Sequence, residues 1–231
     1  MNSQAREGVK YYQYALGKAN EKRKLYITNH PMCSSLYKPN EELIKLYNNF
    51  EVAYLKEEIE IDTISLDYFI DIHKIGNIDF IKIDVQGAEL DIFQGASKTL
   101  KNVLKIVCEV EFIPHYENQP LFGDVCNYLI EHDLMFNKFL GLSGRALKPI
   151  MLNNNPNLPS QHIWTDAVFV HHIQKINFLT DEKLIKLSLL ACVYYSLDLT
   201  FYCLSEYDKR HSTSLAKDWM TKIASEKKPN L

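Results

Sequence analysis

Acidic side chains stand at the ends of two apolar stretches of this sequence that predict buried strands. Asp84 closes the stretch 78–85, and Glu109 and Glu111 lie at the end of the stretch 104–112. Ligands of open α/β sheets bind beyond the carboxyl ends of the strands. If the two strands are parallel neighbours, Asp84 and Glu109 lie beside one crevice. Two adjacent carboxylates there could bind ribose hydroxyls, hold a cation, or take the proton from a hydroxyl group.

A glycine turn connects Asp84 to the next predicted helix. Gln86 and Gly87 form this turn, and glycine lets the backbone turn tightly and a ligand approach closely. The helix N-terminus adds free N–H groups and a partial positive charge. Glu89 falls in the first helical turn, where simple helix capping is the alternative to a binding role. For Asp84, the alternatives are capping the helix or pairing with Lys82, which shares its face of the strand.

Two more polar residues stand near predicted strand ends. His115 follows Pro114 in the loop after 104–112 and is either a general base or an ordinary loop residue. Asp166 starts the final predicted strand. For Glu109 and Glu111, salt bridging at the strand end is the alternative to a role in the site.

The order of predicted elements indicates an α/β fold with a mostly parallel sheet. Acidic and apolar residues alternate strictly over 58–63, which predicts a half-exposed, antiparallel strand. Strands and helices then alternate along the chain, as expected for a parallel sheet finished by an antiparallel strand. From Thr180, a predicted N-cap, the pattern is helical to the end. The predicted strands are 9–16, 25–28, 58–63, 78–85, 104–112, 135–142 and 166–172.

Composition excludes several classes of protein. The 231 residues carry a net charge of -3, so no basic field favours nucleic acid as a partner. The five cysteines form no CxxC pair and indicate small buried side chains in a reducing compartment. No signal peptide is visible, and we expect a cytoplasmic protein.

The apolar run 187–204 has the length of a membrane span. It contains Asp198, Ser188, Ser196 and Thr200, which favours a packed helix of the domain over a membrane-surface helix or a span.

Familiar catalytic motifs are missing. The sequence has no GxSxG, HExxH or GxxxxGK[ST] pattern, which removes serine hydrolases, zincins and P-loop enzymes. We expect no metal site, because too few His or Asp ligands lie at workable spacing for a metal-assisted hydrolase.

Several motifs, in order, resemble the FkbM-type methyltransferases. The most specific is DFIKIDVQGAELDIFQGA (79–96); the others are YALGKANEKRKLYIT (14–28), CSSLYKP (33–39), EIDTISLDYFI (60–70), KIVCEVEF (105–112) and HIWTDAVFVH (162–171). The resemblance covers about residues 9–172. It implies a Rossmann-like fold and S-adenosylmethionine-dependent methylation of a hydroxyl on a small molecule or glycan.

The resemblance also implies site residues. Ala15 and Leu16 would lie beside the adenine, and Asp84 near the transferred methyl group. Candidates for the catalytic base are Asp84, Glu109 and His115. The remaining candidates are Gln86 and Gly87 for the cofactor and Ser34, Ser35, Glu89, Glu111 and Asp166 for the substrate.

One departure from the family pattern stands out. Family members begin with a strand that ends in a glycine-rich loop and a second strand that ends in an acid, and this sequence starts at the family's third strand. We therefore expect a truncated methyltransferase domain over 1–175 and a helical extension over 176–231. Strands 9–16 and 78–85 must then either pair directly or each expose an edge. We expect that the chain could associate with itself or bind a partner through the exposed sheet edge or the C-terminal helices.

Two functions remain open. The first is an O-methyltransferase that is incomplete as this chain and binds S-adenosylmethionine weakly alone. The alternative is a degenerate, non-catalytic methyltransferase fold kept as a binding or scaffold protein.

Overall fold

The first sheet is built on alternating side chains. In the computed structural model, which describes residues 6–151, 153–155 and 161–225, β2 (Glu21–Thr28) and β3 (Leu55–Ile64) form an antiparallel pair. Lys22 and Lys24 of β2 bind the carboxylates of Glu60 and Glu58 of β3 at 2.6 and 2.8 Å. These cross-strand ion pairs explain why one face of β3 is acidic, and the predicted antiparallel strand over 58–63 is confirmed.

The predicted strand 9–16 is wrong in its extent. Only β1 (Ala15–Leu16) forms, parallel to β3 through Thr63 and Ile64. A strand exists only where its N–H and C=O groups meet a partner ladder, and residues 9–14 are not part of a ladder in either sheet. Residues 6–14 remain exposed and outside both sheets.

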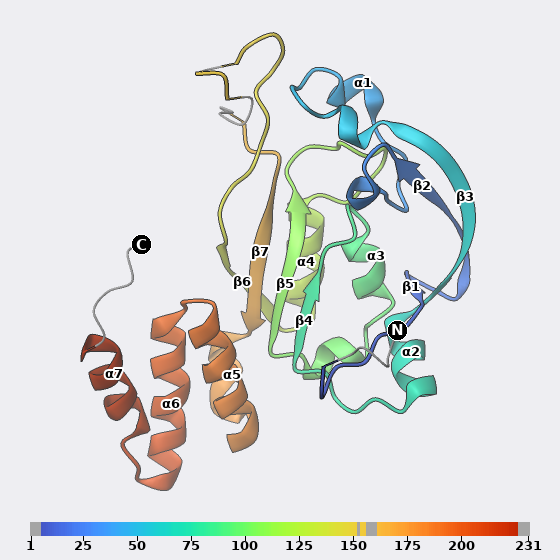
Figure 1. The fold of residues 1–231 in the computed structure, drawn as a ribbon. Helices are drawn as coiled ribbons and strands as arrows, with labels where there is room; N and C mark the ends of the chain where they lie inside the picture. Colours follow the sequence, from blue (N-terminus) through green and yellow to red (C-terminus); the bar gives the residue numbers. More distant parts are fainter. Residues whose placement is uncertain (1–5, 152, 156–160, 226–231) are drawn as a thin grey trace.

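The second sheet carries the core. Its order is β4 (Phe80–Ile83), β5 (Lys105–Glu111), β7 (Trp164–His171), β6 (Leu134–Phe139). The pair β4 and β5 is parallel, whereas β7 is antiparallel to both β5 and β6. The predicted parallel pair and the antiparallel last strand are therefore confirmed. The expected mostly parallel sheet is wrong, because three of the five strand pairings among the described residues are antiparallel and the strands form two sheets of a mixed α/β fold (Figure 1).

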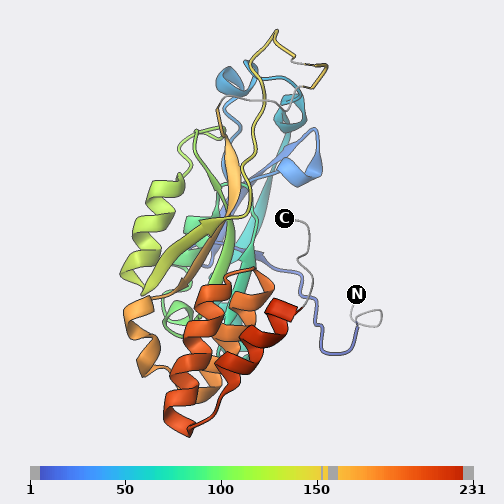
Figure 2. The same ribbon diagram turned by 90° about the vertical axis from the view of Figure 1, so that its left-hand side faces the viewer.

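Helices cover both faces of the second sheet (Figures 1 and 2). One face packs Ile106, Cys108 and Val110 with side chains of α3 and α4, and the other packs Val107, Val168 and Val170 with α5 and α6. Every residue of β5 except Glu109 is buried, as expected of a strand covered on both faces. The helices are α1 (Glu41–Ile44), α2 (Leu66–His73), α3 (Glu89–Gln94), α4 (Phe122–Glu131), α5 (Asp181–Val193), α6 (Leu197–His211) and α7 (Leu215–Ser225).

The C-terminal helices begin where the sequence predicts. The Thr180 hydroxyl oxygen accepts a hydrogen bond from the Lys183 N–H at 3.3 Å and caps α5. The apolar run 187–204 is divided between α5 and α6, which pack against each other and the sheet. No helix among the described residues is long and apolar enough to cross a membrane.

Two contacts hold the first sheet against α3. Arg23 of β2 binds the Asp91 carboxylate of α3 at 3.1 Å. Gly95, after α3, approaches the turn between β1 and β2 so closely that a Cβ on it would lie 2.5 Å from the Gly17 carbonyl oxygen. Even alanine would therefore force the first sheet away from α3.

The two sheets do not pair with each other. Among the described residues, β1 is paired only with β3, and β4 only with β5. A cavity of about 840 Å³, called here the larger cavity, separates them and is lined by residues of both strands. Of the two expected arrangements, the structure has the one with open edges.

Candidate active site

Asp84 and Glu109 meet at the carboxyl ends of β4 and β5. Ile83 is paired with Cys108 in the parallel ladder, so the next residue of each strand brings the two acids side by side. The Gln86 side-chain amide lies between them, and its Nε2 donates to Asp84 Oδ1 at 2.8 Å and to Glu109 Oε2 at 2.6 Å. The predicted crevice with two neighbouring carboxyl groups is present.

The turn that carries Gln86 is held from two sides. The Ser35 hydroxyl donates to the Gln86 carbonyl oxygen at 2.6 Å, and the Tyr116 hydroxyl lies 3.2 Å from Gln86 Oε1. Gln86 has a φ of 57°, in the left-handed region that non-glycine residues rarely adopt. Strain of this kind persists only where surrounding contacts fix it, and it is common in binding sites.

Gly87 continues the turn with a φ of 92°. A Cβ on Gly87 would lie 3.2 Å from Gln119 Nε2 and 3.4 Å from the Tyr116 ring. The space beside this glycine is thus filled by the protein's own side chains. Its binding role remains a prediction, while its backbone conformation and packing already require glycine.

Burial changes the protonation of the acids in this cluster. Burial, with a smaller contribution from the hydrogen bond and charge of Asp84, raises the pKa of Glu109 to about 9. Burial also raises the pKa of Glu89 to about 7 and that of Glu111 well above its usual value. Because a buried carboxylate is costly when charged, Glu109 is protonated at neutral pH.

Lys82 and Asp166 form an ion pair at the edge of the site. Lys82 Nζ lies 2.7 Å from Asp166 Oδ1, and Asp166 is paired with Glu109 across β5 and β7. Lys82 therefore binds Asp166, so the alternative in which Asp84 pairs with Lys82 is not what the structure has. The Asp84 side chain remains exposed.

Asp84 lines two cavities. The larger cavity runs between β1 and β4 and is mostly apolar, with side chains such as Leu16, Leu25, Ile61 and Ile81 in its wall. A smaller cavity of about 280 Å³ is lined by Asp84, Glu109, Asp166, Ser143 and Trp164, among others. The site thus joins an apolar slot to a polar pocket at Asp84.

Some of the predicted site residues line the smaller cavity, some line the larger cavity, and some line neither. Glu109, Asp166 and Asp84 line the smaller cavity, whereas Glu89, Glu111, Gly87 and His115 line neither cavity. Glu89 Oε1 accepts the Val85 N–H at 2.8 Å and so braces the turn into α3, as the capping alternative predicts. The predicted residues that line the larger cavity are Ala15, Leu16, Ser34, Ser35, Asp84 and Gln86.

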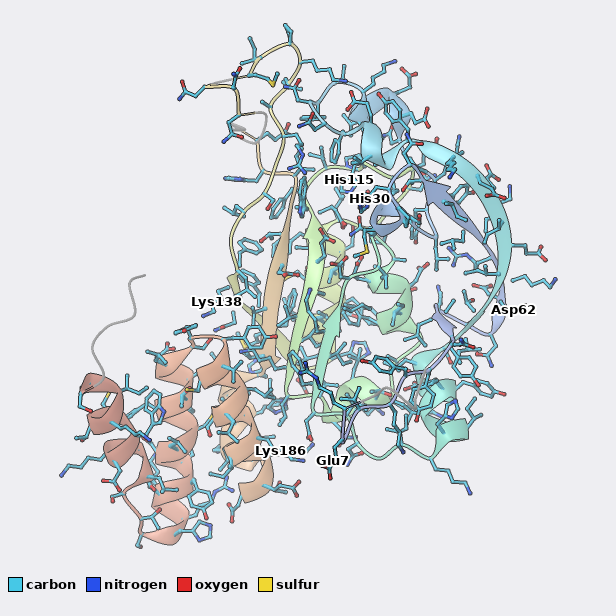
Figure 3. All side chains as sticks on the ribbon, viewed as in Figure 1. Glu7, His30, Asp62, His115, Lys138 and Lys186 are labelled. Atoms are coloured by element: carbon cyan, nitrogen blue, oxygen red, sulfur yellow. The ribbon has the colours of Figure 1, made fainter. Side chains whose placement is uncertain are left out.

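His115 lies in the loop beyond the end of β5 (Figure 3). Its side chain is buried and packs against the tilted rings of Tyr116 and Phe50, whose centroids lie 4.8 and 5.7 Å from its own. Burial lowers its pKa to about 3, so the imidazole is neutral. Its role as a base remains a prediction, and its position favours packing.

Two residues that support the turn were not predicted from sequence, nor were Ser143 and Trp164 of the smaller cavity. Tyr116 and Gln119 support the turn at Gln86 and Gly87, and the Gln119 side-chain oxygen accepts the Tyr116 N–H at 2.6 Å. Both residues are about 30 positions from the turn in the sequence and contact it only in the folded chain. No local sequence pattern could therefore have predicted them. Among the described residues, no group of three or more His, Cys, Asp and Glu is arranged to hold a metal ion.

Comparison with family models identifies residues 2–136, more than half of the chain, as a Methyltransferase FkbM domain. The chain belongs to the FkbM methyltransferase domain family. No curated protein and no solved structure matches it.

The described residues of this FkbM-domain chain fit only part of S-adenosylmethionine, the cofactor that methyltransferases generally use. The apolar walls of the larger cavity suit a planar base, and Asp84 supplies a carboxylate for hydroxyl or ammonium groups. Among the described residues that line the cavity, Lys82 is the one cation for the cofactor's carboxylate, and Lys82 is already engaged by Asp166. The cavity as described therefore does not fit the whole cofactor.

Proposed function

We propose that this chain carries the acceptor side of an S-adenosylmethionine-dependent O-methyltransferase centre on a Rossmann-like fold. The observation that supports it most is the meeting of Asp84 and Glu109, bridged by Gln86, at the carboxyl ends of parallel strands in an FkbM methyltransferase domain. Ligand sites of open α/β sheets lie at this edge.

In this proposal each residue of the cluster has a separate task. Methylation of a hydroxyl requires loss of its proton, and the exposed Asp84 carboxylate accepts that proton. Glu109 keeps its own proton at neutral pH because its pKa is raised to about 9, so it donates a hydrogen bond. Gln86 fixes the distance between the two groups. The polar lining of the smaller cavity favours an acceptor that carries hydroxyl groups, such as a small polyol or glycan.

The test is methyl transfer from labelled S-adenosylmethionine, at millimolar concentration to compensate for weak binding, to a panel of alcohols, polyols and glycans. The expected result is label in a hydroxyl acceptor that falls at least about 100-fold in Asp84→Asn, the order of a lost general base. Asp71→Asn, at an exposed position on α2, should keep the activity. Label that is unchanged in Asp84→Asn would contradict the assignment.

The alternative is a non-catalytic scaffold that keeps the methyltransferase fold. The observation that favours it is the incomplete fit of the larger cavity to the cofactor. A folded chain that binds S-adenosylmethionine but transfers no label to any acceptor in the panel would support the scaffold and contradict the enzyme.

A further inference from the structure

Arg145 is a partly buried cation without an acidic partner. It lies in the connection between β6 and β7, which leaves and re-enters the second sheet at the end where β4 and β5 also finish (Figure 1). No Asp or Glu among the described residues binds its guanidinium, and burial lowers its pKa. A desolvated charge without a counterion is costly, so this position calls for an anion.

The contacts of Arg145 fix its side chain and leave donors unused. The guanidinium carbon lies 4.8 Å from the centre of the Trp164 ring and 6.0 Å from that of Phe50. Its Nη1 donates to the Gly144 carbonyl oxygen at 3.0 Å, while its Nε is buried and has no hydrogen-bond partner. Stacking on rings orients a guanidinium without using the N–H groups in its plane. Those N–H groups match a planar carboxylate.

Arg145 stands next to the smaller cavity. Trp164, on which it stacks, lines that cavity, and so does Ser143, two residues earlier in the chain. The Ser143 N–H donates to the Trp164 carbonyl oxygen at 3.0 Å, which ties the connection between β6 and β7 to the start of β7. Arg145 therefore lies just beyond one wall of the proposed acceptor pocket.

The Cys33 thiol relates Arg145 to the acids of the site. Burial raises the pKa of Cys33, the carboxyl groups of Glu109 and Asp84 raise it further, and the charge of Arg145 opposes them. Electrostatic effects of this kind fall off with distance, so the acids and the guanidinium surround the same thiol. A ligand whose hydroxyl lies at Asp84 has Arg145 as a cation on the far side of the pocket.

We propose that Arg145 binds a carboxylate of the acceptor, so that the substrate is a hydroxy acid, such as a uronic acid sugar, with its hydroxyl at Asp84. This inference rests on the proposed function, which places the acceptor hydroxyl there. The charges of the site favour a single negative charge on the ligand. Lys82 already compensates Asp166, so one guanidinium remains, which suits a carboxylate better than a phosphate dianion.

The first test compares methyl glycosides of glucuronic, galacturonic and mannuronic acid with those of the matching neutral sugars, which carry a hydroxymethyl group in place of the carboxylate. Saturation-transfer NMR of the full wild-type chain at neutral pH, without S-adenosylmethionine, gives the dissociation constants. At least one uronide should bind at least about tenfold tighter than its neutral partner, the order of a hydrogen bond to a charged group. Equal binding within every pair, no binding of any uronide, or tighter binding of the phosphorylated methyl glycoside would overturn the carboxylate assignment.

The second test locates the carboxylate. Arg145→Met keeps an unbranched apolar side chain on Trp164 and Phe50 but removes the charge, and should reduce the preference for the uronide to less than about threefold. The neutral sugar should bind as in the wild type. Arg6→Met, at an exposed position, is the matched control and should keep the full preference. An unchanged preference in Arg145→Met would overturn the role of Arg145, and the wild-type comparison decides the question if that variant does not fold.

The inference and the proposed function fail in different ways. Label transferred to neutral sugars, with no preference for any uronide, would overturn the carboxylate site and leave the methyltransferase standing. A uronide preference that is lost in Arg145→Met, with no label transferred to any acceptor, would support the carboxylate site and contradict the methyltransferase.

Discussion

Gln86 shows how the site depends on single residues. Its side chain bridges two acids and its carbonyl oxygen binds Ser35, while its backbone occupies a strained region. The acids at each end of the bridge follow from the strand pattern in the sequence. The bridge itself does not, because the position of Ser35 opposite the turn depends on how the first sheet packs on α3.

At the residue scale, Glu109 makes stability depend on pH. Its pKa is raised to about 9 in the folded chain, so between pH 5 and 9 the folded state binds more protons than the unfolded state. Stability should therefore fall as pH rises through this window. Glu109→Gln cannot ionise and so removes this pH-dependent loss of stability. It should raise the free energy of unfolding at pH 8.5 by more than about 1 kcal/mol.

The measurement is urea unfolding at several pH values between 5 and 9. Glu109→Gln should flatten the pH dependence, while Glu57→Gln, exposed on β3, should leave the slope as in the wild type. Parallel curves for Glu109→Gln and the wild type would show that Glu109 is charged in the folded chain.

At the element scale, α5 covers a buried lysine at the start of β5. The Lys105 side chain is 0% exposed, its Nζ donates to the Leu190 carbonyl oxygen at 3.0 Å and lies 4.5 Å from the centre of the Tyr194 ring. Burial, assisted by the charge of Lys138, lowers the pKa of Lys105 to about 8. The packing of α5 on the sheet is thus coupled to the protonation of the Lys105 amine.

The sign of this coupling is opposite to that of Glu109. Between pH 8 and 10.5 the unfolded chain binds more protons at Lys105 than the folded chain. The titration of Lys105 therefore increases the stability of the fold as pH rises. Lys105→Met should stabilise the chain at pH 7 by about 1 kcal/mol or more and remove the gain between pH 8 and 10. Chemical unfolding at pH 7 and 10 checks this, with the exposed Lys56→Met as the control. A destabilised Lys105→Met at pH 7 would mean that the hydrogen bond to Leu190 dominates.

The elements differ in how well local pattern predicts them. β3, β5 and the start of α5 follow from alternation, continuous burial and the Thr180 cap, which are all local signals. The stretch 9–14 has the residues of a strand but lies outside both sheets. Strand formation needs a partner edge, and no property of the segment itself shows whether that edge lies within reach.

At the scale of the whole molecule, the two sheets stand apart around the larger cavity. The family pattern left two arrangements, direct pairing of β1 with β4 or an open edge on each, and among the described residues the topology has the open edges. The position of His115 could not be predicted in the same way. Its burial against Phe50 results from packing with a segment more than 60 residues earlier in the chain.

The central claim is that this chain carries the acceptor side of a methyltransferase centre without a complete cofactor site. Isothermal titration calorimetry of the purified full chain with S-adenosylmethionine tests it most directly. The account predicts weak binding or none, with a dissociation constant in the millimolar range or above, because none of the described residues lining the larger cavity is an unengaged cation for the cofactor's carboxylate. A micromolar dissociation constant would contradict it.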